Sequence, residues 1–327
     1  MSKRRSRFRM AAAPEGGSPP QQADLELVAR REERKYVHEV YDAIAGSFSA
    51  TRAGTWPGIR AFLGALPAGS LVLDAGCGNG RYMSLAPLSG AGDLCRPLAE
   101  LAAENHLPGV PPNEVAVAHS LALPHRAGLF DACISIAVIH HFMTTQRRIA
   151  SILEMARVLG IGGVGLVTAW ALPGSRPGTC PGCSDTSAGS RAGFRALFAS
   201  SCPGLERPMP ATGPVLCHIC AEARQAAPTE PIIENEQDLL VGWQLPREAP
   251  HAQQPPQKQS PASDRDLTRY YHFFREFELE NLVQMASMQL AASTTGAESL
   301  HIRSVGWEKE NWSIVFEKVR HSEPTHN

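Results

Sequence analysis

The segment that most restricts how this chain can fold is LVLDAGCGNG, residues 71–80. Its first three residues are apolar and indicate a short buried strand, which Asp74 ends. Glycines follow at every second position, as Gly76, Gly78 and Gly80. Because glycine permits backbone angles and close approaches that a Cβ atom forbids, the segment predicts a strand, a tight turn and a helix built around a ligand.

Two acidic residues stand where such a turn would use them to bind a nucleotide-like cofactor. Asp93 follows about 20 residues after the turn, where a carboxylate takes the ribose hydroxyls. Asp74 is placed to hold a cationic end of the cofactor, directly or through water, which favours S-adenosylmethionine. The motif lacks the G-x-G-x-x-G spacing of dinucleotide sites, so a dinucleotide is disfavoured. A glycine turn without a ligand is the alternative.

Apolar periodicity elsewhere predicts strands that alternate with helices. Helical spacing is found at residues 24–44, 57–66, 97–103, 146–159 and 278–288. Buried strands are predicted at residues 71–73, 115–117, 132–138, 163–170 and 312–318. This order predicts an α/β fold, with a Rossmann-like, doubly wound and mostly parallel sheet.

Composition divides the chain into folded and irregular parts. It contains 28 Gly and 26 Pro, an excess that indicates irregular stretches around a smaller core. We expect a disordered basic and Pro/Gly-rich tail at residues 1–23 and a cofactor-binding core at 24–171. A low-complexity Cys/Pro-rich insertion at 172–262 follows, then a C-terminal part of the same fold at 263–319 and a short tail at 320–327.

Charge and hydropathy limit the partners and the compartment. The net charge is −1, so any affinity for RNA must come from local clusters, among them the basic start MSKRRSRFRM. No run of about 18 apolar residues is present, so we expect no membrane span. The basic start lacks the apolar core of a secretory signal. A cytoplasmic or alternatively nuclear protein with reduced thiols is therefore expected.

Segments on both sides of the insertion resemble the Trm9-like tRNA methyltransferases, which include the methyltransferase domain of the AlkB-homologue eight protein. The resemblance covers roughly two thirds of the chain. Its segments are YVHEVY at 36–41, FS at 48–49, TR at 51–52, WP at 56–57, DAGCG at 74–78, DLCRPL at 93–98, ISIAVIHHF at 134–142, EMARVL at 154–159, QDLLVGW at 237–243 and RYYHFFRE at 269–276. The pair IHHF and RYYH is far more specific than the glycine motif.

The resemblance implies a class I S-adenosylmethionine-dependent enzyme that methylates the carboxymethyl group of a modified wobble uridine in the tRNA anticodon loop, giving a methyl ester. A carboxylate is ionised at neutral pH, so this acceptor needs no general base. Alignment of the carboxylate, the methyl group and the sulfur would then provide most of the rate acceleration. The resemblance also implies a small zinc-binding activator subunit as a partner.

By the same resemblance, individual residues are assigned to roles. The catalytic candidates, which supply cationic donors and stacking surfaces, are His140, Arg269, Tyr270 and His272. The cofactor-binding candidates are Asp74, Gly76, Gly78, Gly80, Asp93, His119 and Ile136. The candidates for contact with RNA are Arg147, Arg148, Tyr271 and Arg275. The structural alternatives are that His140 caps a strand end, that the tyrosines belong partly to the core, and that Arg147 and Arg148 begin an exposed, solvated helix.

The chain departs from the family pattern at several positions. His119 stands where the family has an Asp that receives the adenine amino group. A neutral imidazole nitrogen can accept one hydrogen bond, so weaker cofactor binding is expected. The segment 85–92 is shorter than the corresponding segment of the family and lacks the apolar strand expected before Asp93. Ile161 replaces the Pro of a Pro-Gly-Gly turn, Phe277 a Gly, and Gly242 a Pro.

These departures keep two alternatives open. The first is a catalytically weak or inactive paralogue that binds RNA or a protein partner. The second is a methyltransferase that acts on a small carboxylate, which the RYYH segment disfavours.

The insertion carries two Cys-x-x-Cys pairs, which could form one structural zinc site. Four thiolates at this local spacing suit tetrahedral zinc, although the surroundings are of low complexity. The ligands would be Cys180, Cys183, Cys217 and Cys220. The cysteines expected to be packed thiols instead are Cys77, Cys95 and Cys133.

Overall fold

The computed structural model describes residues 5–7, 22–52, 54–85, 89–105, 114–173, 175, 236–243 and 267–321. In these residues, seven strands form one sheet in the order β4-β3-β2-β5-β6-β10-β9. The strands are β2 (Val72–Ala75), β3 (Ser89–Asp93), β4 (Glu114–Val117), β5 (Phe130–Ile136), β6 (Leu159–Trp170), β9 (Glu298–Glu308) and β10 (Asn311–Arg320). The five strands from β4 to β6 are parallel, whereas β10 runs antiparallel to β6 and β9. The predicted doubly wound, mostly parallel sheet is confirmed.

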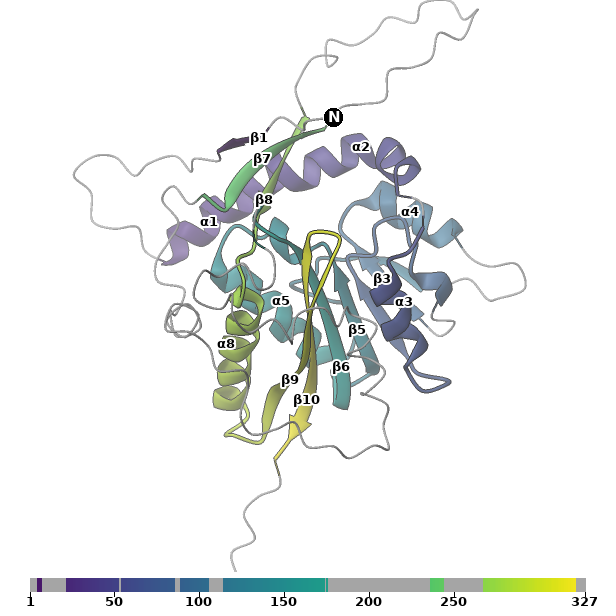
Figure 1. Cartoon of the computed structure of the whole chain (residues 1–327), viewed down its shortest axis with the longest axis vertical. Coiled ribbons are helices and arrows are strands. Elements are labelled where there is room, and N and C mark those ends of the chain that lie inside the picture. The colour runs from purple at the N-terminus through teal and green to yellow at the C-terminus, as the bar shows by residue number, and fades with distance from the viewer. Residues whose placement is uncertain are drawn as a thin grey trace, which may run out of the picture.

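Helices cover both faces of this sheet (Figure 1). The described helices are α1 (Gln22–Glu33), a π-helical turn (Arg34–His38), α2 (Glu39–Ala50), α3 (Pro57–Gly64), α4 (Arg96–Glu104), α5 (Thr145–Val158) and α8 (Glu278–Ser293), of which α1, the turn and α2 lie at one end of the sheet. In β5, Ile134 packs with α3 on one face, and the adjacent Cys133 packs with α5 and α8 on the other. Side chains alternate along a strand in this way, so both faces of β5 are buried and its sequence is a continuous apolar run.

The segment before Asp93 forms a strand although it carries no large apolar residue. β3, with the sequence SGAGD, pairs in parallel with both β2 and β4. A Cβ atom on Gly90 would lie 3.4 Å from the ring of Phe130, and one on Gly92 would lie 3.2 Å from the Cβ atom of Ala118. Neighbouring side chains therefore fill the space above these glycines. The expectation that this strand is missing was wrong, because apolar side chains from outside β3 cover it.

Other boundaries also differ from the sequence predictions. β6 begins at Leu159 rather than at 163, and α8 continues to Ser293. β9 was not predicted, because most of its side chains are half-buried and polar residues interrupt its alternation. Residues 5–7, inside the tail expected to be disordered, form β1 (Arg5–Arg7). That expectation was wrong for these three residues, since β1 pairs antiparallel with β7.

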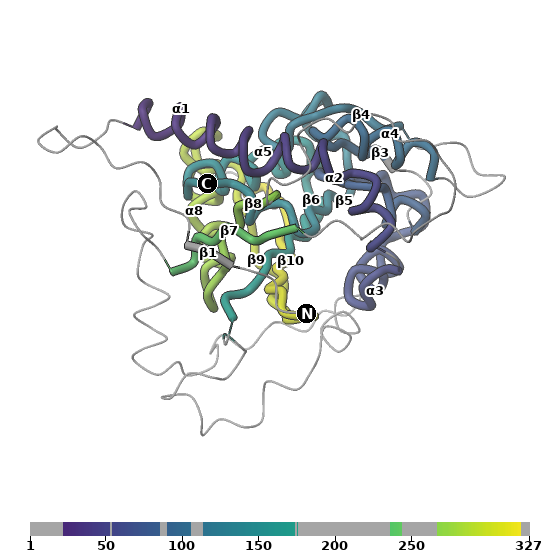
Figure 2. Tube along the Cα trace, turned by 90° about the horizontal axis from the view of Figure 1, so that it is seen from above, coloured from purple at the N-terminus to yellow at the C-terminus, as the bar shows by residue number. Residues whose placement is uncertain are grey.

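A second, smaller sheet lies near one end of the main sheet. It has the order β1-β7-β8 and contains β7 (Asp238–Trp243) and β8 (Leu267–His272). β7 lies within residues 172–262, which were predicted to be a low-complexity insertion, and β8 follows them. Figures 1 and 2 show α1, the π-helical turn and α2 running across the same end. The N-terminal helices and the small sheet therefore meet above the turn that follows β2.

Candidate cofactor and substrate site

One pocket lies at the carboxyl ends of the parallel strands, beneath the N-terminal helices. Its walls include residues from β2, β3 and β5 and from the connections that follow them, together with residues of the π-helical turn and α2. Open α/β sheets bind ligands at this edge, where the strand order reverses. The candidates that line it are Asp74, Gly76, Gly78, Asp93, His119, Ile136, His140 and Tyr271.

The glycine turn is shaped by two positions where no other residue fits. Gly76 has φ +99°, and a Cβ atom there would lie 2.4 Å from Cγ2 of Val138. Gly80 has φ +75°, and a Cβ atom there would lie 2.9 Å from the Cβ atom of Ala102. Positive φ and lack of space therefore both require glycine. Gly80 packs against α4 and is not among the residues that line the pocket.

Asp74 presents a buried carboxylate that lacks a partner. It is 3 % exposed, and neither carboxylate oxygen has a hydrogen-bond donor among the described residues. Burial, together with the nearby Asp93, raises the pKa of this carboxyl to about 7, although Arg81 opposes the shift. A buried carboxylate without a donor is costly to ionise, so the site favours a cation brought by a ligand.

Asp93 is held rigidly at the end of β3. Its Oδ2 accepts a hydrogen bond from the Gly78 amide at 2.8 Å, and its Oδ1 accepts one from the Cys95 amide at 2.9 Å. Burial raises the pKa of this carboxyl, and the two amide bonds lower it. The carboxylate therefore links the glycine turn to the start of α4 and fixes its own orientation at the pocket wall.

His119 lines the pocket in the connection after β4. Its Nδ1 accepts a hydrogen bond from the Leu121 amide at 3.1 Å, and its ring stacks on Phe142 with an interplanar angle of 15°. Burial and nearby positive charge lower the pKa of this imidazole to about 4. The acceptor nitrogen that was expected to receive the adenine amino group is therefore already used within the protein.

Aromatic rings surround His140, which also lines the pocket. His140 is buried, and its Nδ1 accepts a hydrogen bond from the Trp170 amide at 3.2 Å. The rings of Trp170 and Tyr271 stack with centroids 4.4 Å apart and planes 9° apart. Burial lowers the pKa of His140 well below its usual value, so the imidazole is neutral at pH 7.

Two arginines lie near His140, of which Arg52 lines the pocket and Arg269 does not. Arg52 lines the pocket and lies over the ring of Phe48, at 4.8 Å from the centroid. Arg269 is fully buried and donates from Nη1 to the Tyr41 hydroxyl at 3.1 Å. Its Nε and Nη2 have no hydrogen-bond acceptor among the described residues. Arg52 belongs to the TR segment at 51–52, and no role was predicted for it from the sequence.

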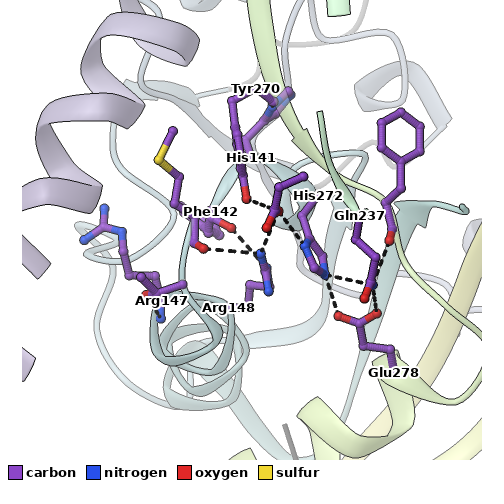
Figure 3. A network of polar contacts seen from close by, with 12 residues as sticks. His141, Phe142, Arg147, Arg148, Gln237, Tyr270, His272 and Glu278 are labelled. Carbon is purple, nitrogen blue, oxygen red and sulfur yellow. Dashed lines mark hydrogen bonds and ion pairs between the residues drawn. The ribbon is translucent and has the colours of Figure 1, made fainter. Parts of the chain in front are cut away.

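Tyr270 and His272 lie outside the pocket wall, in a buried polar network (Figure 3). The Tyr270 hydroxyl donates to Asp238 at 2.5 Å, and the His272 ring lies between Asp238 at 2.8 Å and Glu278 at 2.5 Å. Arg148 bonds to the Phe142 carbonyl in the same network. These contacts join β7, β8, α5 and α8, so Tyr270 and His272 support the site from behind its wall.

Arg147 and Arg148, the candidates for contact with RNA, are buried, so the alternative of an exposed, solvated helix start was wrong as well. Arg147 is 5 % exposed and Arg148 is 1 % exposed. The guanidinium of Arg147 forms an ion pair with the buried Glu33 of α1 at 2.7 Å. Both groups are therefore engaged within the protein, and Arg147 ties α5 to α1. Arg275, by contrast, is exposed.

The remaining expectations concern the cysteines and membrane spans. The four candidate zinc ligands, Cys180, Cys183, Cys217 and Cys220, lie outside the described residues. The other three named cysteines are buried free thiols, as predicted: Cys77, Cys95 and Cys133. None of the described helices combines the length and the apolar character needed to cross a membrane.

Comparisons with known proteins add to this geometry. A family model described as "Methyltransferase domain" matches residues 73–167. A Schizosaccharomyces pombe tRNA (carboxymethyluridine(34)-5-O)-methyltransferase is 31 % identical over 292 residues, which cover 88 % of this chain and 97 % of that protein. The relative of the same name, alkbh8, from Xenopus tropicalis is 34 % identical over 306 residues, with 90 % of this chain and 42 % of that protein covered.

The chain therefore spans less than half the length of the Xenopus relative. An Arabidopsis thaliana protein, also named tRNA (carboxymethyluridine(34)-5-O)-methyltransferase, is 48 % identical over 142 residues, which cover 42 % of this chain and 33 % of that protein.

Proposed function

Because the chain belongs to the tRNA (carboxymethyluridine(34)-5-O)-methyltransferase family, we propose that it methylates the carboxylate of carboxymethylated wobble uridine in tRNA. The methyl donor is S-adenosylmethionine, and the product is the methyl ester. The observation that carries the proposal is a pocket of two polarities. The unpaired carboxylate of Asp74 and the side chain of Arg52 both line it, and Arg269 lies against the lining residues Tyr41 and Tyr271 with two buried N–H groups that have no acceptor among the described residues.

The residues around Asp74 fit S-adenosylmethionine. The donorless Asp74 carboxylate suits the cationic amino-acid part of this cofactor, and Asp93 suits its ribose hydroxyls. The turn between Gly76 and Gly80 brings backbone close to a ligand without side chains in the way. When bound, the cofactor supplies an electrophilic methyl group.

The residues around Arg52 and His140 fit a carboxylate held beside a flat base. Arg269 lies near Arg52, and its Nε and Nη2 donors lack acceptors in the described part of the chain. Guanidinium donors of this kind pair with carboxylates by two parallel hydrogen bonds. The stacked rings of Trp170 and Tyr271 provide an aromatic surface for an extruded anticodon base.

The chemistry assigns positioning rather than proton transfer to the protein. A carboxylate nucleophile is already ionised at pH 7, so no base has to remove a proton. His140 is neutral, and its Nδ1 accepts from the Trp170 amide, so its proton is on Nε2. His140 therefore offers a fixed N–H donor that orients the acceptor group.

The phosphates of the tRNA substrate are negatively charged, and this chain has a net charge of −1 as well. RNA contact must then come from local exposed cations such as Arg275.

A small zinc-binding activator subunit is the second partner that we propose. β4 is an edge strand of the main sheet, and Val117 on it is 46 % exposed. An apolar edge of this kind is suited to a covering subunit.

The alternative of an inactive paralogue loses one of its two grounds. The strand before Asp93 is formed and paired on both sides, so the cofactor wall is complete at that point. The remaining ground is His119, which occupies the pocket wall after β4.

Arg52→Gln tests the proposal. Methyl ester formation would be measured by mass spectrometry of nucleosides, with the full chain, the activator and tRNA that carries the free carboxymethyl group. We expect kcat to fall about 100-fold or more, while calorimetric affinity for S-adenosylhomocysteine is retained, because Arg52 faces the acceptor. Arg60→Gln on the exposed face of α3 is the matched control. A wild-type chain that binds no S-adenosylhomocysteine, or an Arg52→Gln variant with full activity, contradicts the proposal.

A further inference from the structure

Three polar side chains follow neighbouring strands along the pocket rim. Asp74 is the last residue but one of β2, Asp93 ends β3, and His119 lies just beyond β4, in the strand order β4-β3-β2. All three line the pocket. A nucleoside with its ribose at Asp93 and its cationic tail at Asp74 therefore has its base beside His119. This placement rests on the proposed function.

The hydrogen bonds of His119 determine where its proton is. The Leu121 amide donates to Nδ1, and the Ala122 amide donates to the His119 carbonyl at 2.8 Å, so a tight turn holds the side chain. A backbone N–H can only donate, so Nδ1 must be the unprotonated nitrogen. The neutral ring then carries its proton on Nε2. The lowered pKa of this imidazole means that the ring stays neutral at pH 7.

Neighbouring rings hold the His119 ring in this orientation. Phe142 stacks on one face with centroids 5.9 Å apart, and the edge of His38 meets the ring at 5.8 Å. An aspartate at the same position would have two acceptor oxygens, one for the Leu121 amide and one for an amino group of the ligand. Histidine keeps the first acceptor but replaces the second by a donor.

We propose that His119 recognises the adenine base of the cofactor by donating from Nε2–H to a ring nitrogen, rather than by accepting from the exocyclic amino group. Two facing N–H donors repel each other, so an amino group cannot take the position opposite Nε2. Unsubstituted ring nitrogens of adenine are acceptors and match this donor. The substitution of histidine for aspartate therefore reverses the polarity of base recognition and leaves binding intact.

A metal ion is the competing explanation for this neighbourhood. Glu33, His38 and His119 each offer one potential ligand atom, and these atoms lie within 4.8 Å of one another. However, both carboxylate oxygens of Glu33 accept hydrogen bonds from Arg147, and one also accepts from the Met143 amide. A divalent cation would have to displace the Arg147 guanidinium or lie beside it. The geometry therefore favours a hydrogen-bonding role for His119.

Deaza analogues of S-adenosylhomocysteine test the proposal, because each replaces one ring nitrogen by C–H. Calorimetry would measure the affinity of the full chain for the parent compound and for its 1-deaza, 3-deaza and 7-deaza forms. The variants His119→Asn and His119→Asp have the same shape, but Asn retains an N–H donor whereas Asp offers only acceptors. We expect one analogue to bind about tenfold more weakly to the wild type and to His119→Asn. His119→Asp should bind that analogue and the parent with similar affinity.

The possible failures can be told apart. If the wild type binds the parent and all three analogues equally well, His119 donates to no ring nitrogen and this inference alone is refuted. The same conclusion follows if His119→Asp shows the same loss as the wild type, or if a chelator abolishes the selectivity. A wild-type chain that does not bind the parent compound refutes the proposed function, and the inference with it. The wild-type measurement suffices for these decisions if a variant does not fold.

Discussion

The Asp74 carboxylate is buried at the end of β2 with no donor among the described residues, so its ionisation destabilises the ligand-free protein. Burial raises its pKa from 3.8 to about 7. A carboxyl whose pKa is raised on folding contributes stability below its unfolded pKa and loses it as pH rises through the folded pKa. The cost of ionisation therefore grows between about pH 4 and pH 7 and stays constant above pH 7.

The magnitude of this cost follows from the size of the shift. Each pKa unit corresponds to about 1.4 kcal/mol, so the shift from 3.8 to about 7 sets a cost on the order of 4 kcal/mol above pH 7. Asp74→Asn keeps the shape of the side chain and removes the charge. We expect the free energy of unfolding of the variant, relative to the wild type, to rise by up to this amount between pH 4 and pH 7.

The same substitution should weaken cofactor binding. Only the ionised carboxylate attracts a cationic ligand, so with a pKa of about 7 the wild-type affinity for S-adenosylhomocysteine should fall about 25-fold from pH 7.5 to pH 5.5. Asp74→Asn should bind this ligand more weakly at pH 7.5 and lose most of the pH dependence. Asp74→Asn is therefore expected to raise the free energy of unfolding and to lower the affinity for S-adenosylhomocysteine.

Urea unfolding from pH 4 to pH 8 and calorimetry over the range in which the protein is folded would measure both effects. Asp131→Asn is the control, because it makes the same chemical change at an exposed carboxylate at the start of β5. The reasoning fails if Asp74→Asn and Asp131→Asn show the same pH profile of stability. It also fails if the ligand affinity of the wild type does not depend on pH between 5.5 and 7.5.

Three further predictions concern other parts of the chain. Burial raises the pKa of Glu278, but His272 outweighs this effect and lowers the pKa to about 2, so the stabilisation by Glu278 is present above about pH 4.5 and is lost as pH falls through about 2. Glu278→Gln should unfold about 3 kcal/mol more easily at pH 7 in urea, and this gap should narrow below about pH 4.5 and close at about pH 2 or lower. Gly76→Ala should lose about 2 kcal/mol or more of stability in thermal unfolding, and adding Val138→Ala should restore only part, because the positive φ remains. If the cysteine pairs of the insertion bind zinc, Cys183→Ser should lower the metal content of the purified chain, and equal or absent zinc in both proteins would contradict the site.

Local pattern was sufficient for the features that depend on neighbouring residues in the chain. The strand ending in Asp74, the turn at Gly76 and the sheet class follow from apolar runs and glycine spacing, because these properties act over a few residues. β3 was missed for the opposite reason. Its apolar cover comes from Phe130 and Ala118, which are distant in sequence, so its own residues carry no strand signal.

The roles of the polar residues were decided by tertiary structure. A sequence cannot indicate that Arg147 is neutralised by Glu33, 114 positions away, or that Arg269 is left with buried, unsatisfied donors. It also cannot show which nitrogen of His119 is protonated, since that depends on how the turn aims the Leu121 amide. Hydrogen bonds and charge pairing depend on distances of a few ångströms, and only the packing of the helices against the sheet sets those distances.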